Sequence, residues 1–304
     1  MENHDFTGTT FGLVRTVSGR IDGFSRGATR RLVRDGVMEK VHHNVLRIAD
    51  GDITPVQRAV AAAMRTGGAV SHGTLLRLED VRGWRSFPEA HISSHDGRWQ
   101  AIDQVIVHRR KGIEGLLRLS GDVLVSSVSL AIIDAGFDAD VQRIRSAYHD
   151  AWHRGLLTPQ EFAATLDSVA ASGRLGVTRA RELLERYPAD GNPARSVNEI
   201  RLFDAIYDAG LPPPRLNHPV VRPGGKDAFI DLAWPEIGYG VEIDHTATHD
   251  AGTAEYDLRR HGDLTVMGWF LDRPMEAHLE GPDGLAKWVS VIAARLRMLG
   301  RGAA

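Results

Sequence analysis

Residues 229–244 read FIDLAWPEIGYGVEID, and we begin with this segment because it predicts a β-hairpin. Two short runs rich in apolar and aromatic residues flank a turn that contains proline and glycine. If residues 235–238 form the turn, Trp234 pairs with Tyr239, and the same register places Asp231 opposite Glu242. Opposed side chains in antiparallel strands have Cβ atoms roughly 4.5–5.5 Å apart, and like charges there are destabilising.

A third acid belongs to the same face of this hairpin. Side chains alternate along a strand, so Asp244 shares the face of Asp231 and Glu242. Three carboxylates on a half-buried surface repel one another unless a cation neutralises them. We therefore predict a divalent metal ion at this face.

Length and composition set limits on the rest of the chain. Its 304 residues suffice for two or three domains, and 42% hydrophobic and 25% charged residues are ordinary values for a globular protein. The absence of cysteine excludes disulfides and thiolate ligands, so any metal must use oxygen or imidazole donors. No segment approaches the ~18 apolar residues of a membrane span, and no signal peptide is visible. We expect a cytoplasmic protein with no membrane partner.

The N-terminal region is basic although the net charge of the chain is −2. Residues 11–47 contain eight Lys/Arg and three acids. We expect a short helix, a turn, a basic helix over about 26–35 with Ser25 as N-cap, and a small β-wing around Asn44. Arginines share one face of the basic helix or adjoin it: Arg26, Arg30, Arg31 and Arg34. They could contact DNA phosphates, although this spacing also fits an ordinary solvated helix face.

The segment FSRGATRRLVRDGVMEKVHHNVLR at residues 24–47 resembles the winged-helix module of AbiEi-type antitoxins of type IV toxin–antitoxin systems. The segments AVSH at 69–72 and HRR at 108–110 resemble the linked α/β region of that family. Asn44 stands where the family usually carries glycine, and asparagine also tolerates left-handed geometry. The resemblance implies DNA as a partner, and an operator or a cognate toxin as further partners.

The middle region carries few chemical signals. Thr54-Pro55 and Thr158-Pro159 predict the starts of helices over about 55–66 and 159–171. Residues 123–135 read as a strand that is followed by a helix. The histidines are scattered, and we expect surface or packing roles for them: His72, His91, His95, His108, His149 and His153. The i, i+4 spacing of the last two suits a metal, but no carboxylate companion supports a site.

A helix over about 197–209 places Glu199 on its apolar stripe. Ser196 and Glu199 have the spacing of a capping box, in which the glutamate binds the backbone at the start of the helix. The alternative is a functional carboxylate. The acidic hairpin that follows favours this alternative, because helix Glu, strand Asp and strand Glu is the order found in PD-(D/E)xK nucleases.

Residues 196–297 resemble the very-short-patch-repair (Vsr)-like endonuclease domain of actinobacteria, which often follows an AbiEi-type module. The resemblance rests on SVNEIRLFDAIYDAGLPPP, the hairpin, and EYDLRRHGDLTVMGWFL at 255–271. It implies Mg²⁺ or Mn²⁺ on Asp231 and Glu242, with the Ile243 carbonyl as a further ligand, and hydrolysis of DNA. The implied catalytic set is Glu199, Asp231, Glu242, Asp244 and His249. Two departures are Asp244, where many such nucleases have lysine, and His245, where the family has glycine.

We therefore expect an α/β (α+β) protein with three parts: a winged-helix DNA-binding module at 1–50, an AbiEi-like α/β middle region at 51–190, and a restriction-endonuclease-like mixed sheet flanked by helices at 191–304. The leading hypothesis is a metal-dependent endonuclease that acts on DNA. The alternative is an antitoxin or transcriptional repressor whose nuclease fold has lost its activity. Cleavage of RNA by the same site is a third possibility.

Overall fold

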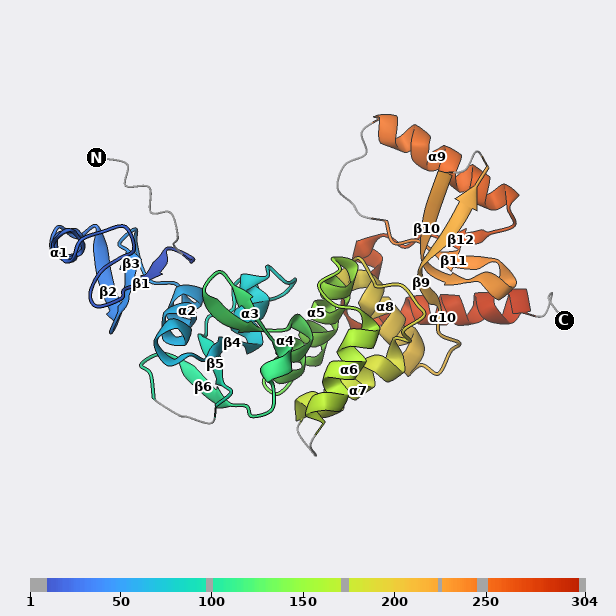
Figure 1. Ribbon diagram of the computed structural model, residues 1–304. Helices are drawn as coiled ribbons and strands as arrows, with labels where there is room; N and C mark the ends of the chain where they lie inside the picture. Colours follow the sequence, from blue (N-terminus) through green and yellow to red (C-terminus); the bar gives the residue numbers. More distant parts are fainter. Residues whose placement is uncertain (1–9, 97–100, 171–174, 224–225, 245–250, 301–304) are drawn as a thin grey trace. The chain divides into compact units, whose positions relative to one another are not determined.

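A computed structural model describes residues 10–96, 101–170, 175–223, 226–244 and 251–300. Within these ranges the chain has a mixed α+β fold with ten α-helices and three β-sheets (Figure 1), which confirms the expected fold class. The contacts divide it into two compact units, Met1–Ala151 with Leu156–Leu183, and Trp152–Gly155 with Leu184–Ala304. Among the described residues, none of the helices has both the length and the apolar character needed to cross a membrane.

The N-terminal module packs helix α1 against a small sheet with strand order β1-β3-β2. Its elements are β1 (Leu13–Arg15), α1 (Arg26–Arg34), β2 (Met38–His42) and β3 (Val45–Ile48). Ser25 caps α1 as predicted, because its side chain accepts a hydrogen bond from the Ala28 N–H. Leu32, Met38 and Leu46 belong to the small core beneath the helix. Asn44 has φ 62°, so the wing does turn through left-handed geometry.

The short helix that we expected before α1 is wrong. Residues 13–15 form strand β1 instead, which pairs antiparallel with β3. Leu13 and Val14 are buried by this pairing, and Arg15 donates a hydrogen bond to the carbonyl of Met64 at 2.6 Å. Burial of both apolar side chains in the sheet therefore outweighs the local helical pattern.

The middle region is built on a five-stranded sheet with the order β6-β5-β4-β8-β7. Its strands are β4 (Ala69–Val70), β5 (His91–Ser94), β6 (Ile106–Arg109), β7 (Leu117–Ser120) and β8 (Val123–Ser126). Its helices are α2 (Pro55–Thr66), α3 (His72–Leu78), α4 (Val128–Ala135), α5 (Val141–His153), α6 (Pro159–Val169) and α7 (Leu175–Arg186). Thr54 and Thr158 form complete capping boxes with Gln57 and Glu161, so both predicted helix starts are confirmed.

The second unit contains a four-stranded mixed sheet with the order β12-β11-β10-β9. Its elements are α8 (Val197–Asp208), β9 (Arg215–Arg222), β10 (Lys226–Trp234), β11 (Tyr239–Val241), α9 (Ala251–Val266), β12 (Phe270–Asp272) and α10 (Gly281–Gly300). Strands β9, β10 and β11 are antiparallel, and α9 connects β11 to the parallel strand β12. Trp234 pairs with Tyr239 across the turn, so the predicted hairpin register is confirmed.

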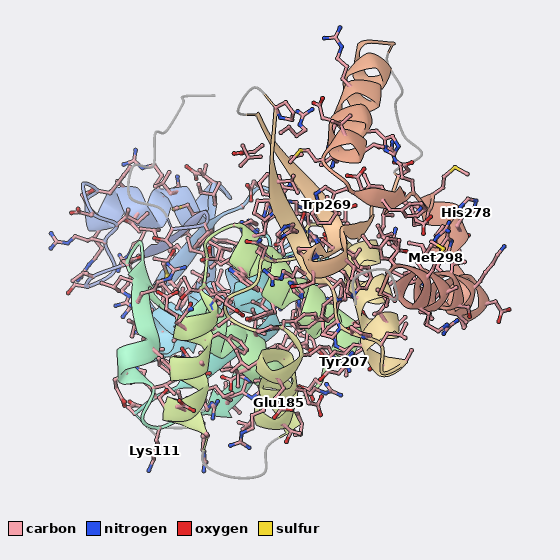
Figure 2. The ribbon with its side chains drawn as sticks, turned by 90° about the vertical axis from the view of Figure 1, so that its right-hand side faces the viewer. Lys111, Glu185, Tyr207, Trp269, His278 and Met298 are labelled. Atoms are coloured by element: carbon pink, nitrogen blue, oxygen red, sulfur yellow. The ribbon has the colours of Figure 1, made fainter. Side chains whose placement is uncertain are left out.

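Close packing fixes this sheet. A Cβ atom at Gly240 would lie 2.6 Å from the Ile230 side chain and 2.9 Å from that of Leu271. Trp269, which is labelled in Figure 2, packs against the core cluster that contains Ile230 and Leu264. Helix α10 contacts α8, and its Ile292 is fully buried. The acidic residues of the hairpin are therefore mounted on a rigid, well-packed framework.

Candidate functional site

Three acids of the second unit form one electrostatic cluster. Glu199 comes from α8, Asp231 from β10, and Glu242 follows β11 directly, and both glutamates are buried. The pKa of Asp231 is raised to about 7, first by burial and then by the negative charge of Glu199, with a further contribution from Glu242. Carboxylates close enough to raise the pKa of a neighbour in this way share one environment. The structure therefore brings together the helix acid and the two hairpin acids that the sequence singled out.

Glu199 is held by the start of its own helix and by a neighbouring strand. Ser196 Oγ accepts a hydrogen bond from the Glu199 N–H, but the Glu199 carboxylate accepts from the N–H of Arg195 at 2.9 Å rather than from that of the capping residue. Its Oε2 atom also accepts from Asn217 Nδ2 at 2.7 Å. Glu199 therefore braces the start of its helix through Arg195 rather than through a complete capping box, and its negative charge also raises the pKa of Asp231.

Asn217 is a positioning residue that the sequence did not indicate. It lies in β9 with φ 44°, a left-handed conformation that is uncommon outside glycine and that asparagine tolerates. Its side chain is buried and also donates to the Pro193 carbonyl at 3.0 Å. The pairing of β9 with β10 is irregular at this point, opposite Asp231. This local twist directs the amide to Glu199.

Two arginines supply part of the positive charge that the acidic face requires. Arg260 of α9 forms hydrogen bonds to both carboxylate oxygens of Glu242, and Arg273 Nη2 lies 2.7 Å from Asp244 Oδ1. The sequence predicted a metal ion as the neutralising cation, and these ion pairs supply positive charge to Glu242 and Asp244 that the sequence did not indicate. Burial nevertheless raises the pKa of Glu242 despite both guanidinium groups. The protein charges therefore neutralise only part of the cluster.

These arginines leave the hairpin acid Asp231 without an ion pair. Its Oδ2 atom accepts a hydrogen bond from the Ile243 N–H at 2.8 Å, and no lysine, arginine or histidine of the described residues forms an ion pair with it. Two carboxylates with water and phosphate oxygens suffice for Mg²⁺. The donor set at Asp231 and Glu242 therefore fits a hard divalent ion, although in the described part of the chain three acids do not converge on one point. His249, and His245 with it, lie outside the described residues.

The predicted DNA-binding arginines are exposed on α1 but differ in their contacts. Arg26 donates to the carbonyl of Ser18 at 2.9 Å, and Arg34 pairs with Asp35 at 2.8 Å. Among the described residues, neither the Arg30 nor the Arg31 side chain has a hydrogen bond or an ion pair. Arg30, Arg31 and Arg34 line one shallow hollow on the helix. Three of the four arginines therefore gather on one solvent-facing surface.

The structure also assembles a histidine cluster that sequence reasoning missed. It consists of His72, His91 and His108, which come from the start of α3 and from strands β5 and β6. One ring nitrogen of each lies within 4.8 Å of those of the others. The His91 Nδ1 and His108 Nε2 atoms are 3.0 Å apart, and the His72 and His108 rings stack with centroids 3.7 Å apart. These three histidines are therefore clustered rather than scattered.

Polar partners and backbone geometry orient the rings of this cluster. His91 Nε2 lies 2.9 Å from Glu89 Oε2, and His72 Nδ1 lies 2.9 Å from Ser71 Oγ. His72 also has φ 53°, and such non-glycine geometry costs about 1–3 kcal/mol and concentrates at functional sites. Burial lowers the pKa of His72 well below its ordinary value and that of His108 to about 4, so both rings are neutral near pH 7.

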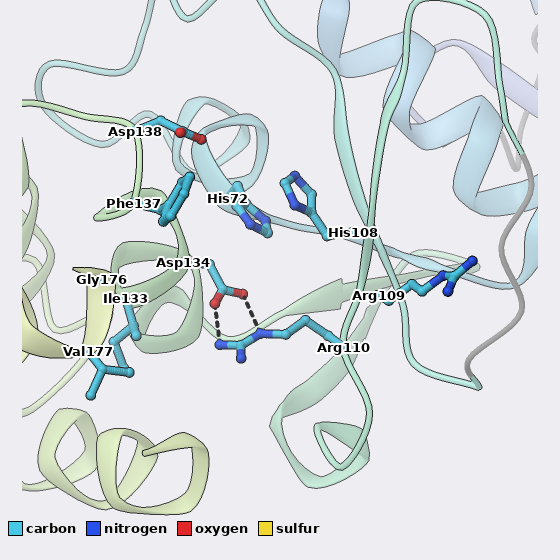
Figure 3. Close-up of a pocket in the computed structure, with 10 residues that line it drawn as sticks. All are labelled: His72, His108, Arg109, Arg110, Ile133, Asp134, Phe137, Asp138, Gly176 and Val177. Atoms are coloured by element: carbon cyan, nitrogen blue, oxygen red, sulfur yellow. Dashed lines mark hydrogen bonds and ion pairs between the residues drawn. The ribbon is translucent and has the colours of Figure 1, made fainter. Parts of the chain in front are cut away.

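Two cavities border the cluster. One, of about 310 Å³, is lined by His72 and His108, and Figure 3 shows these rings side by side next to the buried Arg110–Asp134 ion pair. The other, of about 280 Å³, is lined by His72 and His91 together with Trp84 and Phe87. The signal in the sequence was a histidine in or directly after each of three short β-type runs. Without the strand order, nothing placed those runs side by side.

Comparisons with known proteins give relatives but no family description. No protein-family model matches the chain. Two similar proteins, named uncharacterized protein MT2308 and uncharacterized protein Rv2248, come from two strains of Mycobacterium tuberculosis. Each is 38% identical to this chain over 242 residues, which cover 78% of this chain and 85% of the relative.

Proposed function

The chain belongs to the family of the Mycobacterium tuberculosis proteins MT2308 and Rv2248, and we propose that it is a DNA-binding protein with a metal-dependent endonuclease-like domain that hydrolyses phosphodiester bonds. The observation that carries this proposal is the cluster of Glu199, Asp231 and Glu242, in which Asp231 has a pKa of about 7. Buried acids with a deficit of positive charge are suited to bind a cation, and perturbed pKa values are typical of active sites.

Each acid has a role in this proposal. Asp231 and Glu242 hold Mg²⁺ or Mn²⁺ through carboxylate oxygens, and Glu199, fixed by Asn217, orients the attacking water. A bound divalent ion supplies positive charge to the scissile phosphate and acidifies that water. Asp244 occupies the position at which many such nucleases have a lysine. Its ion-pair partner Arg273 places a positive charge close to this position. That guanidinium can stabilise the charge that develops on the phosphate.

The N-terminal module supplies DNA affinity in this proposal. Arg30 and Arg31 are exposed, and their guanidinium groups have no described hydrogen bond or ion pair, so their charges are available to phosphates. Phosphate contacts of this kind contribute affinity without sequence specificity. The adjoining hollow between α1 and the wing adds Lys40 and His42 on the same module.

Cleavage assays on purified protein test the proposal. Plasmid and oligonucleotide DNA, with RNA as a separate substrate, are incubated with Mg²⁺, Mn²⁺ or EDTA. We expect metal-dependent cleavage of DNA that is lost in Asp231→Ala and Glu242→Gln. Glu236→Gln is the matched control, because Glu236 lies in the turn of the same hairpin and is paired with the exposed Arg215. Unchanged cleavage in both site variants, or no cleavage with any metal, contradicts the proposal.

One observation favours a second function. Both carboxylate oxygens of Glu242 are engaged by Arg260, as expected for a nuclease fold that has exchanged its metal for protein charges. The chain would then be an antitoxin or transcriptional repressor that binds an operator or a cognate toxin. This alternative predicts specific DNA binding without cleavage, together with unchanged binding in Glu242→Gln.

A further inference from the structure

We propose that His72, His91 and His108 form a binding site for a transition-metal ion of the Zn²⁺ class, with three imidazole ligands and one exchangeable position. This site lies in the first compact unit, whereas the acid cluster lies in the second. The two proposals are therefore independent, and either can fail alone.

The ring contacts assign a ligand atom to each histidine. If His91 donates its Nε2–H to Glu89, its Nδ1 lone pair faces His108 Nε2. If His72 donates its Nδ1–H to Ser71 Oγ, its Nε2 lone pair is left for a metal. Metal-binding histidines commonly donate their second N–H to a carboxylate or another oxygen in this way. Glu89 and Ser71 therefore have the positions of outer partners of a metal site.

The ring nitrogens lie near the distances that a metal site requires. Tetrahedral Zn²⁺ with Zn–N bonds of about 2.0–2.1 Å places its nitrogen ligands about 3.3 Å apart. The three nitrogens are within 4.8 Å of one another, and one pair is already 3.0 Å apart. The rings of His72 and His108 stack, so binding of the ion would require these side chains to rotate until the three lone pairs face one point.

The chemistry of the donors selects the class of ion. Imidazole suits Zn²⁺, Cu²⁺, Ni²⁺ and Fe²⁺, whereas Mg²⁺ and Ca²⁺ prefer oxygen donors. Glu89 adds a negative charge beside His91, which partly offsets the charge of a divalent ion. A packing role alone does not account for the left-handed backbone at His72 or for the polar partners of its ring and that of His91.

Within the described ranges no fourth His, Asp or Glu joins the three histidines, and open space borders them instead. His72 borders both cavities, with His108 beside it in one and His91 in the other. Three protein ligands with an open position are typical of zinc sites that exchange water or bind a small ligand. The site is therefore of the exchangeable kind and not a closed structural one.

Titration of the full-length protein with Zn²⁺ tests the site. Protein stripped with chelator is titrated by calorimetry, and Co²⁺ substitution reports geometry through its visible d–d absorption. We expect one Zn²⁺ per chain and tetrahedral Co²⁺ bands. Both should be lost in His108→Ala and retained in His153→Ala, which removes an exposed histidine outside the cluster. Asp231→Asn should leave them unchanged, which separates this site from the acid cluster.

A second variant covers the case in which His108→Ala does not fold. Glu89→Gln leaves the ligands in place and is expected to weaken Zn²⁺ binding by about 10–100-fold, as for other outer partners. Glu114→Gln, an exposed glutamate, is its control and is expected to bind Zn²⁺ like the native protein. Absence of stoichiometric Zn²⁺ binding by the folded native protein, or equal affinity in Glu89→Gln and the native protein, overturns the proposal.

Discussion

The side-chain amide of Asn217 donates a hydrogen bond to the carboxylate of Glu199, with 2.7 Å between Nδ2 and Oε2. Both residues are buried, and the strand that carries Asn217 adopts left-handed geometry at this position. The hydrogen bond links β9 to α8 and fixes the helix acid beside the hairpin. Glu199 in turn raises the pKa of Asp231, so Asn217 acts on the acid cluster through its neighbour.

Asn217→Ala should destabilise the protein by about 1–3 kcal/mol, because a buried carboxylate loses a hydrogen bond. Chemical denaturation measures the change. The control is Asn198→Ala, which removes an amide that donates to Glu276 from a half-buried position of α8, and we expect a change below about 1 kcal/mol there. An equal loss of stability in the two variants would contradict the role of Asn217 in positioning Glu199.

Asp231 should make stability depend on pH. Its pKa in the folded protein is about 7, above the ordinary value of 3.8, so the folded state binds the proton more tightly than the unfolded state. The resulting stabilisation is complete below about pH 4 and is lost as pH rises through 7. Asp231→Asn should abolish this loss. The free energy of unfolding of the variant, relative to that of the native protein, should therefore be larger at pH 8 than at pH 5 by a few kcal/mol, at about 1.4 kcal/mol for each pKa unit.

Denaturation of the native protein and of Asp231→Asn at pH 5 and pH 8 measures this difference. Subtracting the pH dependence of the variant from that of the native protein removes the contribution of groups that titrate in both. The control is Asp227→Asn, an exposed acid in the same strand, for which the pH dependence should match that of the native protein. A parallel pH dependence for the native protein and Asp231→Asn would show that Asp231 is ionised like an ordinary carboxylate.

Arg260 and a divalent ion should compete for the same acids. Arg260→Gln removes hydrogen bonds to Glu242, which should cost about 1.5–3 kcal/mol. If the acids bind metal, Mg²⁺ should raise the melting temperature of Arg260→Gln more than that of the native protein. Arg215→Gln breaks a pair with the exposed Glu236 and serves as control. Melting temperatures that do not respond to Mg²⁺ in any variant favour the repressor alternative.

The hairpin register could be predicted from the sequence because it depends on local rules. A Pro/Gly turn and alternating residues fix which side chains face each other, and the pairing of Trp234 with Tyr239 follows. The caps at Thr54 and Thr158 likewise depend on four consecutive residues. Arg260 and Arg273 could not be assigned to the acids, because their contacts depend on how α9 and the segment after β12 return to the hairpin.

The histidine cluster shows the same limit more clearly. His91 and His108 lie on neighbouring parallel strands, and parallel pairing carries no turn signal in the sequence. Strand β4, which precedes His72, pairs with β5 and with the distant β8. Long-range strand order therefore assembles the cluster, and residue spacing alone suggested only the pair His149 and His153.

Gly73 should be essential for the arrangement around His72. A Cβ atom there would lie 2.4 Å from Trp84 and 2.6 Å from Phe87. Gly73→Ala should therefore destabilise the protein by about 1–3 kcal/mol through overpacking and displace the start of α3. Gly115→Ala is the matched control, because nothing lies within 4 Å of its added Cβ. Thermal denaturation compares the two, and equal melting temperatures would mean that the aromatic rings move aside freely.

The basic surface of α1 leads to a prediction about salt dependence. Arg30→Ala with Arg31→Ala removes two charges that make no described contact within the protein, so folding should persist while DNA binding weakens. The slope of log K against log[salt] should fall by about 0.9 for each phosphate that the variant no longer neutralises, or about 1.8 in total. Fluorescence anisotropy at several salt concentrations measures this slope.

The control is the double variant Lys111→Ala with Lys287→Ala. It removes the same charge from exposed positions elsewhere and should leave the slope unchanged. If both double variants reduce the slope equally, DNA binding reflects overall charge rather than a surface on α1.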